Sequence, residues 1–302
     1  MANNGTIYTG LSDGTIATIT PDGNISVLYK FNDTNGVYGI IISSDDKTLY
    51  FVTEYKGLIK LDIETKTPTY LLEGLDGKNF AALNNLCLDE ENQIIYVTEA
   101  TSITMRNSNK EVLLKHRLGR IISYNLKTKE TTVLLKDLAF PNGIVYEKST
   151  SSIIFSELNR HRIVRYYVDG PKKGTLEYII ENLFGFGDNL KLNEKGELLV
   201  AIPATRDPLL DSLNEKPEIR KLMIYLPERL IYAFAKKRAG GVRIDTKTGK
   251  ITEYIFAAPT KTFFVTTLLE KNNKQYFSSL RSPTIIVVDK NTQNTTNESG
   301  EL

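Results

Sequence analysis

The sequence contains few of the residues from which catalytic and metal sites are most often built. Among 302 residues there is one cysteine, Cys87, there are two histidines, and tryptophan is absent. A single cysteine excludes an intramolecular disulfide and a site built from several thiolates. Two histidines are also too few for a cluster of imidazole and thiolate ligands. A metal site in this chain would therefore depend on oxygen ligands.

Long apolar runs and an excess of one charge are absent as well. No stretch of 18 apolar residues occurs, and no signal-like segment opens the chain, so we expect the chain in this form to be soluble. The 38 Lys and Arg residues are mixed with 36 Asp and Glu residues, without a basic stripe or interleaved aromatics. We therefore expect no nucleic-acid partner. A hydrophobic fraction of 41% is ordinary for a globular protein and can supply a core.

A pair of short β-branched strands joined by a polar turn recurs along the chain. One example is 58–63, followed by the turn Glu64-Thr65-Lys66 and the strand 69–72. Such pairs are predicted to be β-hairpins, and their recurrence indicates a repeat protein. The pairs are 16–19 with 25–29, 58–63 with 69–72, 121–126 with 131–135, 163–168 with 176–180 and 242–245 with 251–255, and a sixth begins at 284.

Further strand pairs lie between these hairpins. They are 37–43 with 48–53, 86–89 with 94–98, 144–146 with 153–156, 190–193 with 198–202 and 263–269 with 275–280. Two strands plus one hairpin make a four-stranded sheet, so the sequence predicts an all-β fold, a six-bladed β-propeller, as one domain over 1–290. The lack of repeated helices argues against a doubly wound α/β fold. The polar tail 291–302 is predicted to be disordered.

Two insertions interrupt the repeat, 101–117 in the third blade and 207–239 in the fifth. In the second insertion, Asp207-Pro208 is predicted to cap a helix whose apolar residues recur at helical spacing. The favoured interpretation is a helical cover packed on the rim of the propeller. The alternative is a lid over a central pocket or a peripheral membrane contact, supported by Lys236, Lys237 and Arg238.

Three successive β-units begin with an amide or acid in front of an apolar run. The segments are Asn84-Asn85-Leu86, Phe140-Pro141-Asn142-Gly143 and Gly187-Asp188-Asn189-Leu190. Because proline restricts the residue before it, Phe140 is predicted to be extended, with Asn142 held on the turn that follows. The recurrence predicts that oxygen atoms from successive blades converge on one place.

From Gly119 to Arg229 the chain resembles the strictosidine synthase-like family, in particular its adipocyte plasma membrane-associated branch. The matching phrases are LAFPNGIV, RIVRYYVDGPKKGT, GFGDNLKLNEKGELLVA and LNEKPEIRKL, with YKGLIKLD at Tyr55–Asp62 and SSLRSP at Ser278–Pro283. The resemblance implies a six-bladed, calcium-dependent propeller related to paraoxonases and gluconolactonases, with arylesterase-like or lactonase-like hydrolysis in some members. It also implies a secretory or membrane-anchored location.

Matched residue by residue, the resemblance implies a central metal site whose ligands are Asn84, Asn142, Asp188 and Asn189. Their amide and carboxylate oxygens suit a hard cation such as Ca²⁺, and no His/Cys cluster competes for the metal. For any one Asn the ordinary alternative is a satisfied turn residue. The recurrence at three successive blade entrances favours a metal.

The chain departs from the family pattern in three places. The family has a Gly-Pro-Glu phrase on the first inner strand, whereas this chain passes from Met1-Ala2-Asn3-Asn4 directly into the strand 6–10. We expect the first blade to lack its innermost strand, as in an incomplete sequence or a degenerate propeller. The segment Val265–Leu268 has no acid before Glu270, so strictosidine synthesis is not expected. The disulfide of the related enzymes cannot form from Cys87 alone.

The remaining candidates for catalysis are few. His116 ends the third-blade insertion and is a candidate base, with a structural role as the alternative. His161, between two arginines, is predicted to be a solvated residue at the edge of an outer strand. Asp188 is the candidate carboxylate. The phrase Gly10–Gly14 matches a nucleophile elbow by letters only, because it joins two predicted strands.

Two functions remain open. The first is metal-assisted hydrolysis of a small ester or lactone, in which the cation polarises the carbonyl and water or a carboxylate attacks. The second is a binding propeller that holds a ligand or ion without turnover.

Overall fold

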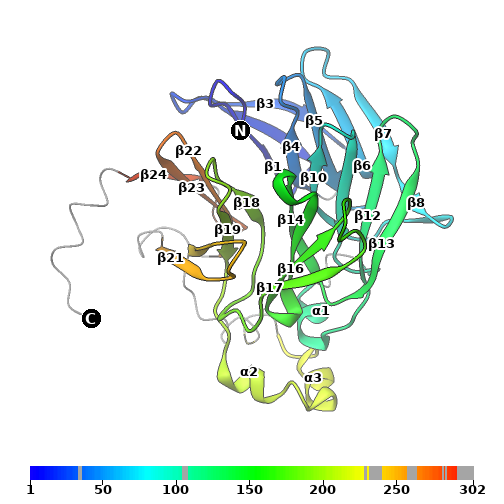
Figure 1. Cartoon of the computed structure of the whole chain (residues 1–302), viewed down its shortest axis with the longest axis vertical. Coiled ribbons are helices and arrows are strands. Elements are labelled where there is room, and N and C mark those ends of the chain that lie inside the picture. The colour runs from blue at the N-terminus through cyan, green and yellow to red at the C-terminus, as the bar shows by residue number, and fades with distance from the viewer. Residues whose placement is uncertain are drawn as a thin grey trace. The chain divides into compact units, whose positions relative to one another are not determined.

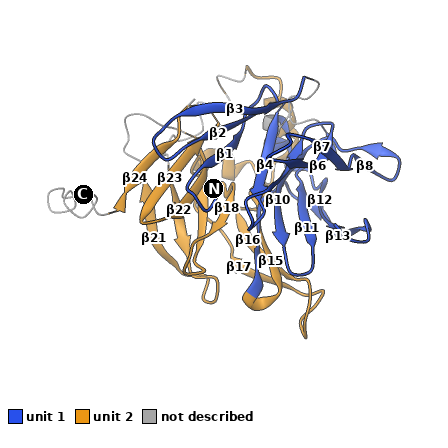
Figure 2. Ribbon diagram, turned by 90° about the horizontal axis from the view of Figure 1, so that it is seen from above, with its two compact units in different colours: residues 1–148 blue, residues 149–302 orange. Residues whose placement is uncertain are grey.

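The computed structural model describes residues 1–32, 36–103, 108–227, 230, 240–256, 264–280, 282 and 284–290. The chain divides into two compact units, 1–148 and 149–302 (Figure 2). The single domain predicted for 1–290 stays a prediction. The predicted disordered tail and the basic residues 236–238 lie outside the described residues.

Antiparallel sheets make up nearly all of unit 1 (Figure 1). The first sheet consists of β1 (Ile7–Gly10), β2 (Thr15–Ile19) and β3 (Ile25–Lys30), and the second of β4 (Val37–Ile42), β5 (Thr48–Thr53), β6 (Gly57–Asp62) and β7 (Pro68–Leu72). The third consists of β10 (Leu83–Asp89), β11 (Ile94–Glu99), β12 (Gly119–Asn125) and β13 (Thr131–Leu138). A small ribbon, β8 (Gly74–Leu75) and β9 (Lys78–Asn79), precedes the third sheet, helix α1 (Ser108–Leu114) lies in its insertion, and β14 (Pro141–Glu147) closes the unit.

The rest of the chain continues the same pattern. The fourth sheet has the order β14-β15-β16-β17, with β15 (Ser152–Glu157), β16 (Arg162–Tyr167) and β17 (Leu176–Ile180). Short 3₁₀ helices, η2 (Lys148–Thr150) and η3 (Leu158–Arg160), join its strands. The fifth sheet holds β18 (Leu190–Leu192), β19 (Leu198–Ile202), β20 (Gly240–Ile244) and β21 (Ile251–Phe256), and the sixth holds β22 (Val265–Lys271), β23 (Lys274–Ser279) and β24 (Ile286–Asp289).

These six sheets are the blades of a six-bladed β-propeller, as the repeat predicted. In each four-stranded sheet the strands follow one another in chain order, each antiparallel to the last. The first sheet has three strands, β1-β2-β3, which agrees with the expectation of a blade without its innermost strand. The described residues of the sixth sheet also form three strands.

In the turns of the outer hairpins, an Asp or Asn side chain accepts hydrogen bonds from backbone N–H groups. The Asp62 carboxylate accepts hydrogen bonds from the backbone N–H and hydroxyl of Thr65, at 2.8 and 2.9 Å. Asn125 and Asp245 accept from the backbone in the same way in later blades. This Asx-type turn explains why an Asp or Asn lies three residues before a Thr in each of these hairpins.

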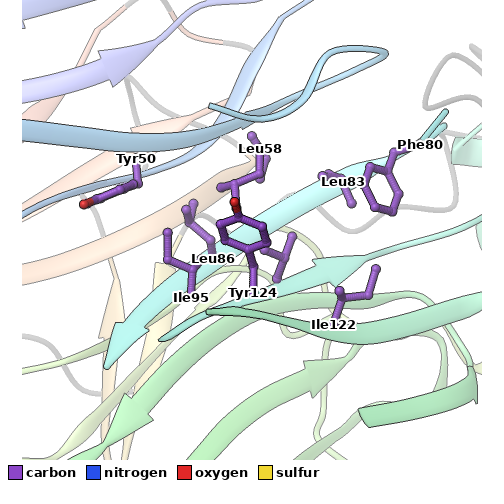
Figure 3. Close-up of a cluster of buried hydrophobic side chains, with 10 residues drawn as sticks. Tyr50, Leu58, Phe80, Leu83, Leu86, Ile95, Ile122 and Tyr124 are labelled. Atoms are coloured by element: carbon purple, nitrogen blue, oxygen red, sulfur yellow. The ribbon is translucent and has the colours of Figure 1, made fainter. Parts of the chain in front are cut away.

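The core of unit 1 is made by side chains that point inward from neighbouring blades (Figure 3). Leu58 from β6, Leu86 from β10 and Ile122 from β12 are all almost completely buried in one cluster. Alternate residues of each strand lie on the same face, so the alternating apolar pattern supplies this cluster directly. The cluster includes Leu83 and Leu86 of β10, the strand that also contains Asn84.

Candidate functional site

Asn142 is the most unusual predicted ligand in the structure. It is the second residue of β14, and only 5% of its surface is exposed. Its side-chain oxygen, Oδ1, has no hydrogen-bond partner among the described residues. A buried amide oxygen without a partner costs about 1–3 kcal/mol. A hard cation would supply the missing partner, so this donor fits the metal that the family resemblance implies.

Asn84 lies at an irregularity of the neighbouring blade. In the pairing of β10 with β11, Leu83 faces Glu99 and Asn85 faces Thr98, so Asn84 is the extra residue of a bulge. Bulges redirect a side chain away from the regular pleat and are common beside functional sites. The neighbouring Asn85 is different, because its Oδ1 accepts the backbone N–H of Leu86 at 2.8 Å.

The backbone before Asn142 is strained, contrary to the sequence prediction. Phe140 is buried but has a φ of 60°, the left-handed region, so the prediction of an extended Phe140 is wrong. This conformation is an outlier for a bulky side chain. Pro141 lies so close to Gly119 that a Cβ on this glycine would be 2.1 Å from the proline Cδ. Burial of Phe140 and this close approach override the local preference of the residue before a proline.

Asp188 and Asn189 are held in unit 2, immediately before β18. The backbone N–H of Asp188 donates to the Ala201 carbonyl at 2.9 Å. The Asn189 amide nitrogen, Nδ2, donates to the Thr267 hydroxyl at 3.0 Å, which fixes the orientation of the amide. The predicted ligands therefore fall two in each unit. Among the described residues no group of three or more His, Cys, Asp or Glu side chains is arranged for a metal, so amide oxygens would have to contribute.

His116 is oriented by an acid that the sequence analysis missed. Its Nδ1 lies 2.9 Å from the Oε1 of the buried Glu111, and its ring is 45% exposed. The other oxygen of Glu111 accepts the Thr101 hydroxyl at 3.1 Å. An imidazole held by a carboxylate is the usual arrangement of an oriented base. The signal in the sequence was an acid within the insertion helix, five residues before the histidine.

The segment that carries His116 reaches the end of unit 1 where Asn142 lies. His116 precedes β12 by three residues, and the first residue of β12 is the Gly119 that contacts Pro141. Thr101 lies two residues after the end of β11, on the same edge of the third sheet. The insertion thus places His116 and Glu111 at the edge where β11 ends and β12 begins, and not at the edge formed by the hairpin turns.

His161 is buried, so the prediction of a solvated edge residue is wrong. It ends η3 in the left-handed conformation with a φ of 52°, which turns the side chain into unit 2. Its ring meets the edge of Phe186 at a centroid distance of 4.7 Å, and Nδ1 lies 3.3 Å from the Gly185 carbonyl oxygen. Its role is structural.

Two buried acids end the second strands of the third and fourth blades. Glu99 pairs with Arg120 at 2.6 Å, and Glu157 pairs with Arg162 at 2.5 Å. Burial raises the pKa of Glu99, and the hydrogen bond and charge of Arg120 oppose that effect. Each acid therefore forms an ion pair with an arginine on the next strand of its own sheet, which is a structural role.

The helical insertion of unit 2 contains α2 (Pro208–Ser212) and α3 (Pro217–Met223), which extend beyond the ends of the strands of that unit (Figure 1). The predicted cap is confirmed, since Asp207 accepts from the backbone N–H of Leu209 at 2.9 Å. Met223 is the buried residue of α3, whereas Leu222 and Tyr225 are 69% and 83% exposed. The interpretation of this insertion as a cover packed on the rim stays a prediction. None of the described helices is long and apolar enough to span a membrane.

The fold and the site together define the class of protein, which is a β-propeller with side-chain oxygen atoms at the starts of its strands. Residues 84–171 match the strictosidine synthase family. The chain is 34% identical over 190 residues to the strictosidine synthase-like protein 13 of Arabidopsis thaliana, covering 63% of this chain and 47% of the relative. It is 27% identical over 304 residues to the adipocyte plasma membrane-associated protein of Salmo salar, covering 94% and 73%. The chain is therefore related to the strictosidine synthase-like family and to this branch, as predicted.

The chain spans only 47% and 65% of the first two curated relatives that it matches, both from Arabidopsis thaliana. Among solved structures, a chain of a nidogen/laminin complex has a TM-score of 0.65 at 13% identity, covering 95% of this chain and 90% of that one. A gluconolactonase from Xanthomonas campestris has a TM-score of 0.64 at 12% identity, covering 92% and 79%. These likenesses establish a fold shared with gluconolactonases.

Proposed function

We propose that this protein is a calcium-assisted hydrolase of a small ester or lactone. The observation that carries the proposal is the buried Oδ1 of Asn142, which lacks a partner among the described residues. Keeping such an atom is costly unless a ligand satisfies it. The family relationship and the fold shared with gluconolactonases support the same conclusion.

Asn142 anchors the cation in this proposal, and the further ligands are those predicted from the sequence, Asn84, Asp188 and Asn189. Asp188 supplies the negative charge, which raises affinity for a hard cation more than an amide does. When bound, the cation polarises the substrate carbonyl and stabilises the oxyanion that develops on it.

His116 is the proposed base. With Nδ1 directed at the Glu111 carboxylate, the neutral ring leaves Nε2 unprotonated and able to accept a proton. A water molecule gives its proton to Nε2 as its oxygen bonds to the carbonyl carbon. The alcohol oxygen leaves with a proton returned from the imidazole, so the ring ends in its starting state.

Hydrolysis of phenyl acetate and of a γ-lactone tests the proposal. We expect activity that is lost in excess EGTA, restored by Ca²⁺ and lost in Asp188→Asn, which removes the charged ligand. Asp169→Asn, an exposed turn acid of the same unit, is the matched control and should retain activity. Hydrolysis that persists in EGTA, or in Asp188→Asn, would contradict the proposal.

The alternative is a propeller that binds an ion or ligand without turnover. It is favoured by the burial of His161, which leaves His116 as the one exposed imidazole among the described residues. Calcium binding without turnover of either substrate would support this alternative.

We further propose that the helical insertion contacts a lipid surface. Leu222 lies in the last turn of α3 and Tyr225 two residues beyond its end, and they are 69% and 83% exposed. Exposed Leu and aromatic residues on a short helical segment are typical of interfacial binding. We expect Leu222→Ser with Tyr225→Ser to weaken co-sedimentation with vesicles of phosphatidylcholine and phosphatidylserine several-fold. Leu280→Ser, equally exposed but on another element, should not, and equal loss in both would refute the contact.

A further inference from the structure

The hydroxyl of Thr98 connects the two predicted ligand segments of unit 1. Thr98 lies on β11 and is fully buried. Its Oγ1 accepts the backbone N–H of Asn85 at 3.0 Å and lies 2.7 Å from the carbonyl oxygen of Asn142. The carbonyl oxygen of Asn85 is farther away, at 3.3 Å. Because a hydroxyl has one proton to donate, the shorter contact indicates that Thr98 donates its hydrogen bond to the Asn142 carbonyl oxygen.

The same arrangement occurs independently in unit 2. Ser156, fully buried on β15, donates its hydroxyl proton to the carbonyl oxygen of Asp188 at 3.0 Å. Thr98 and Ser156 occupy the same place in successive blades, since each immediately precedes the buried acid that ends the second strand. In both units the accepting carbonyl belongs to a predicted cation ligand.

Thr53 provides the contrasting case. It ends β5, the second strand of the second blade, and precedes Glu54, and it is also fully buried. Its Oγ1 has no hydrogen-bond partner among the described residues. A hydroxyl at this place therefore occurs without a bond to a neighbouring carbonyl in the second blade, whereas the described residues of the third and fourth blades form that bond.

We propose that Thr98 and Ser156 are positioning residues that aim the ligand side chains of Asn142 and Asp188. The inference rests on the proposed calcium site and deepens it. A hydrogen bond to the carbonyl fixes the peptide plane, and the peptide plane fixes the direction in which a short Asn or Asp side chain leaves the backbone. A cation site needs its oxygens placed to within about 0.5 Å, so this control is needed for tight binding.

The strained backbone at Phe140 explains why the hydrogen bond from Thr98 to the Asn142 carbonyl is needed. A bulky residue with a φ of 60° persists only where the surrounding structure holds it, and here it lies two residues before the ligand. Without the Thr98 bond the segment would be free to relax towards an ordinary conformation. Relaxation would rotate the Asn142 peptide and move Oδ1 away from its place.

Calorimetric titration of the full chain with Ca²⁺ tests the inference. Thr98→Val keeps the shape and removes the hydroxyl, and we expect Kd to rise about 10- to 100-fold, the usual effect of losing a partner that orients a ligand. Thr98→Ser restores the hydroxyl and should bind like the parent. Thr53→Val is the matched control and should leave Kd unchanged. Ser156→Ala should weaken binding in the same range.

The outcomes separate this inference from the proposed site. Urea unfolding in EGTA establishes that each variant is folded, because a merely structural role would lower that stability without changing the Kd of the folded protein. A folded Thr98→Val with parental Kd, or a Thr98→Ser that binds as weakly as Thr98→Val, overturns the inference alone. If Thr98→Val does not fold, an unchanged Kd in Ser156→Ala overturns it. A parent that binds no Ca²⁺ overturns the proposed function and the inference together.

Discussion

Replacing Asn142 with leucine is expected to abolish calcium binding without destabilising the cation-free protein. Oδ1 of Asn142 is buried and has no hydrogen-bond partner among the described residues, so folding gains nothing from it in the absence of a cation. Leucine has a similar shape, and replacing an unsatisfied polar group by an apolar one is neutral or stabilising by up to about 1 kcal/mol. Calorimetry should show at least a hundredfold weaker binding, and urea unfolding in EGTA an unchanged or higher midpoint.

An ordinary turn asparagine should behave in the opposite way. Oδ1 of Asn193 accepts the backbone N–H groups of Lys195 and Glu197 at 3.0 and 2.9 Å. Asn193→Leu should therefore lower the unfolding midpoint and leave calcium affinity unchanged. If Asn142→Leu lowered the midpoint as much as Asn193→Leu and kept its calcium affinity, Asn142 would be a structural residue and not a ligand.

Replacing Arg243 with methionine is expected to cost about 3 kcal/mol of stability at pH 7, the largest single effect on folding that we predict. Arg243 is nearly buried and contacts Glu197 at 3.1 Å, Glu253 at 2.9 Å and Glu270 at 2.5 Å. Removing the positive partner leaves the buried Glu270 carboxylate poorly compensated, and breaking such a pair typically costs about 3–5 kcal/mol. Urea unfolding measures the loss. Lys221→Met, which removes an exposed pair with Glu218, should cost less than about 1 kcal/mol.

The cost of Arg243→Met should fall at acidic pH. Burial acts to raise the pKa of Glu270, but hydrogen bonds from Gln275, Lys290 and Asn193 and the charge of Arg243 together hold it below the ordinary value of 4.5. A lowered pKa means that the carboxylate stabilises the folded state fully above about pH 4.5 and less as the pH falls through the folded pKa. The difference between the parent and Arg243→Met should therefore be full at pH 7 and shrink below pH 4.5. A difference that grows on acidification would contradict this account.

Local chemistry was sufficient to predict the propeller. The Asx-type turn at Asp62 forms between residues close in the chain, and the alternating strands around it bury one face whatever lies beyond them. The cap at Asp207 is local in the same sense, because its partners lie two and three residues away. Repetition of such short-range rules gave the number of blades, whereas the blade with three strands was predicted from the family resemblance.

The sequence by itself therefore determined the fold class, the family relationship and the candidate cation ligands. Only the tertiary structure decided how those residues are held. Phe140 adopts the left-handed conformation because its burial outweighs the preference of a residue before proline for an extended backbone. His161 is buried because its ring packs against Phe186 and contacts the Gly185 carbonyl oxygen. The partners of Asn142 and Asp188, Thr98 and Ser156, lie 44 and 32 residues away. Hydrogen bonds across such separations depend on how neighbouring blades pack, and no local pattern encodes them.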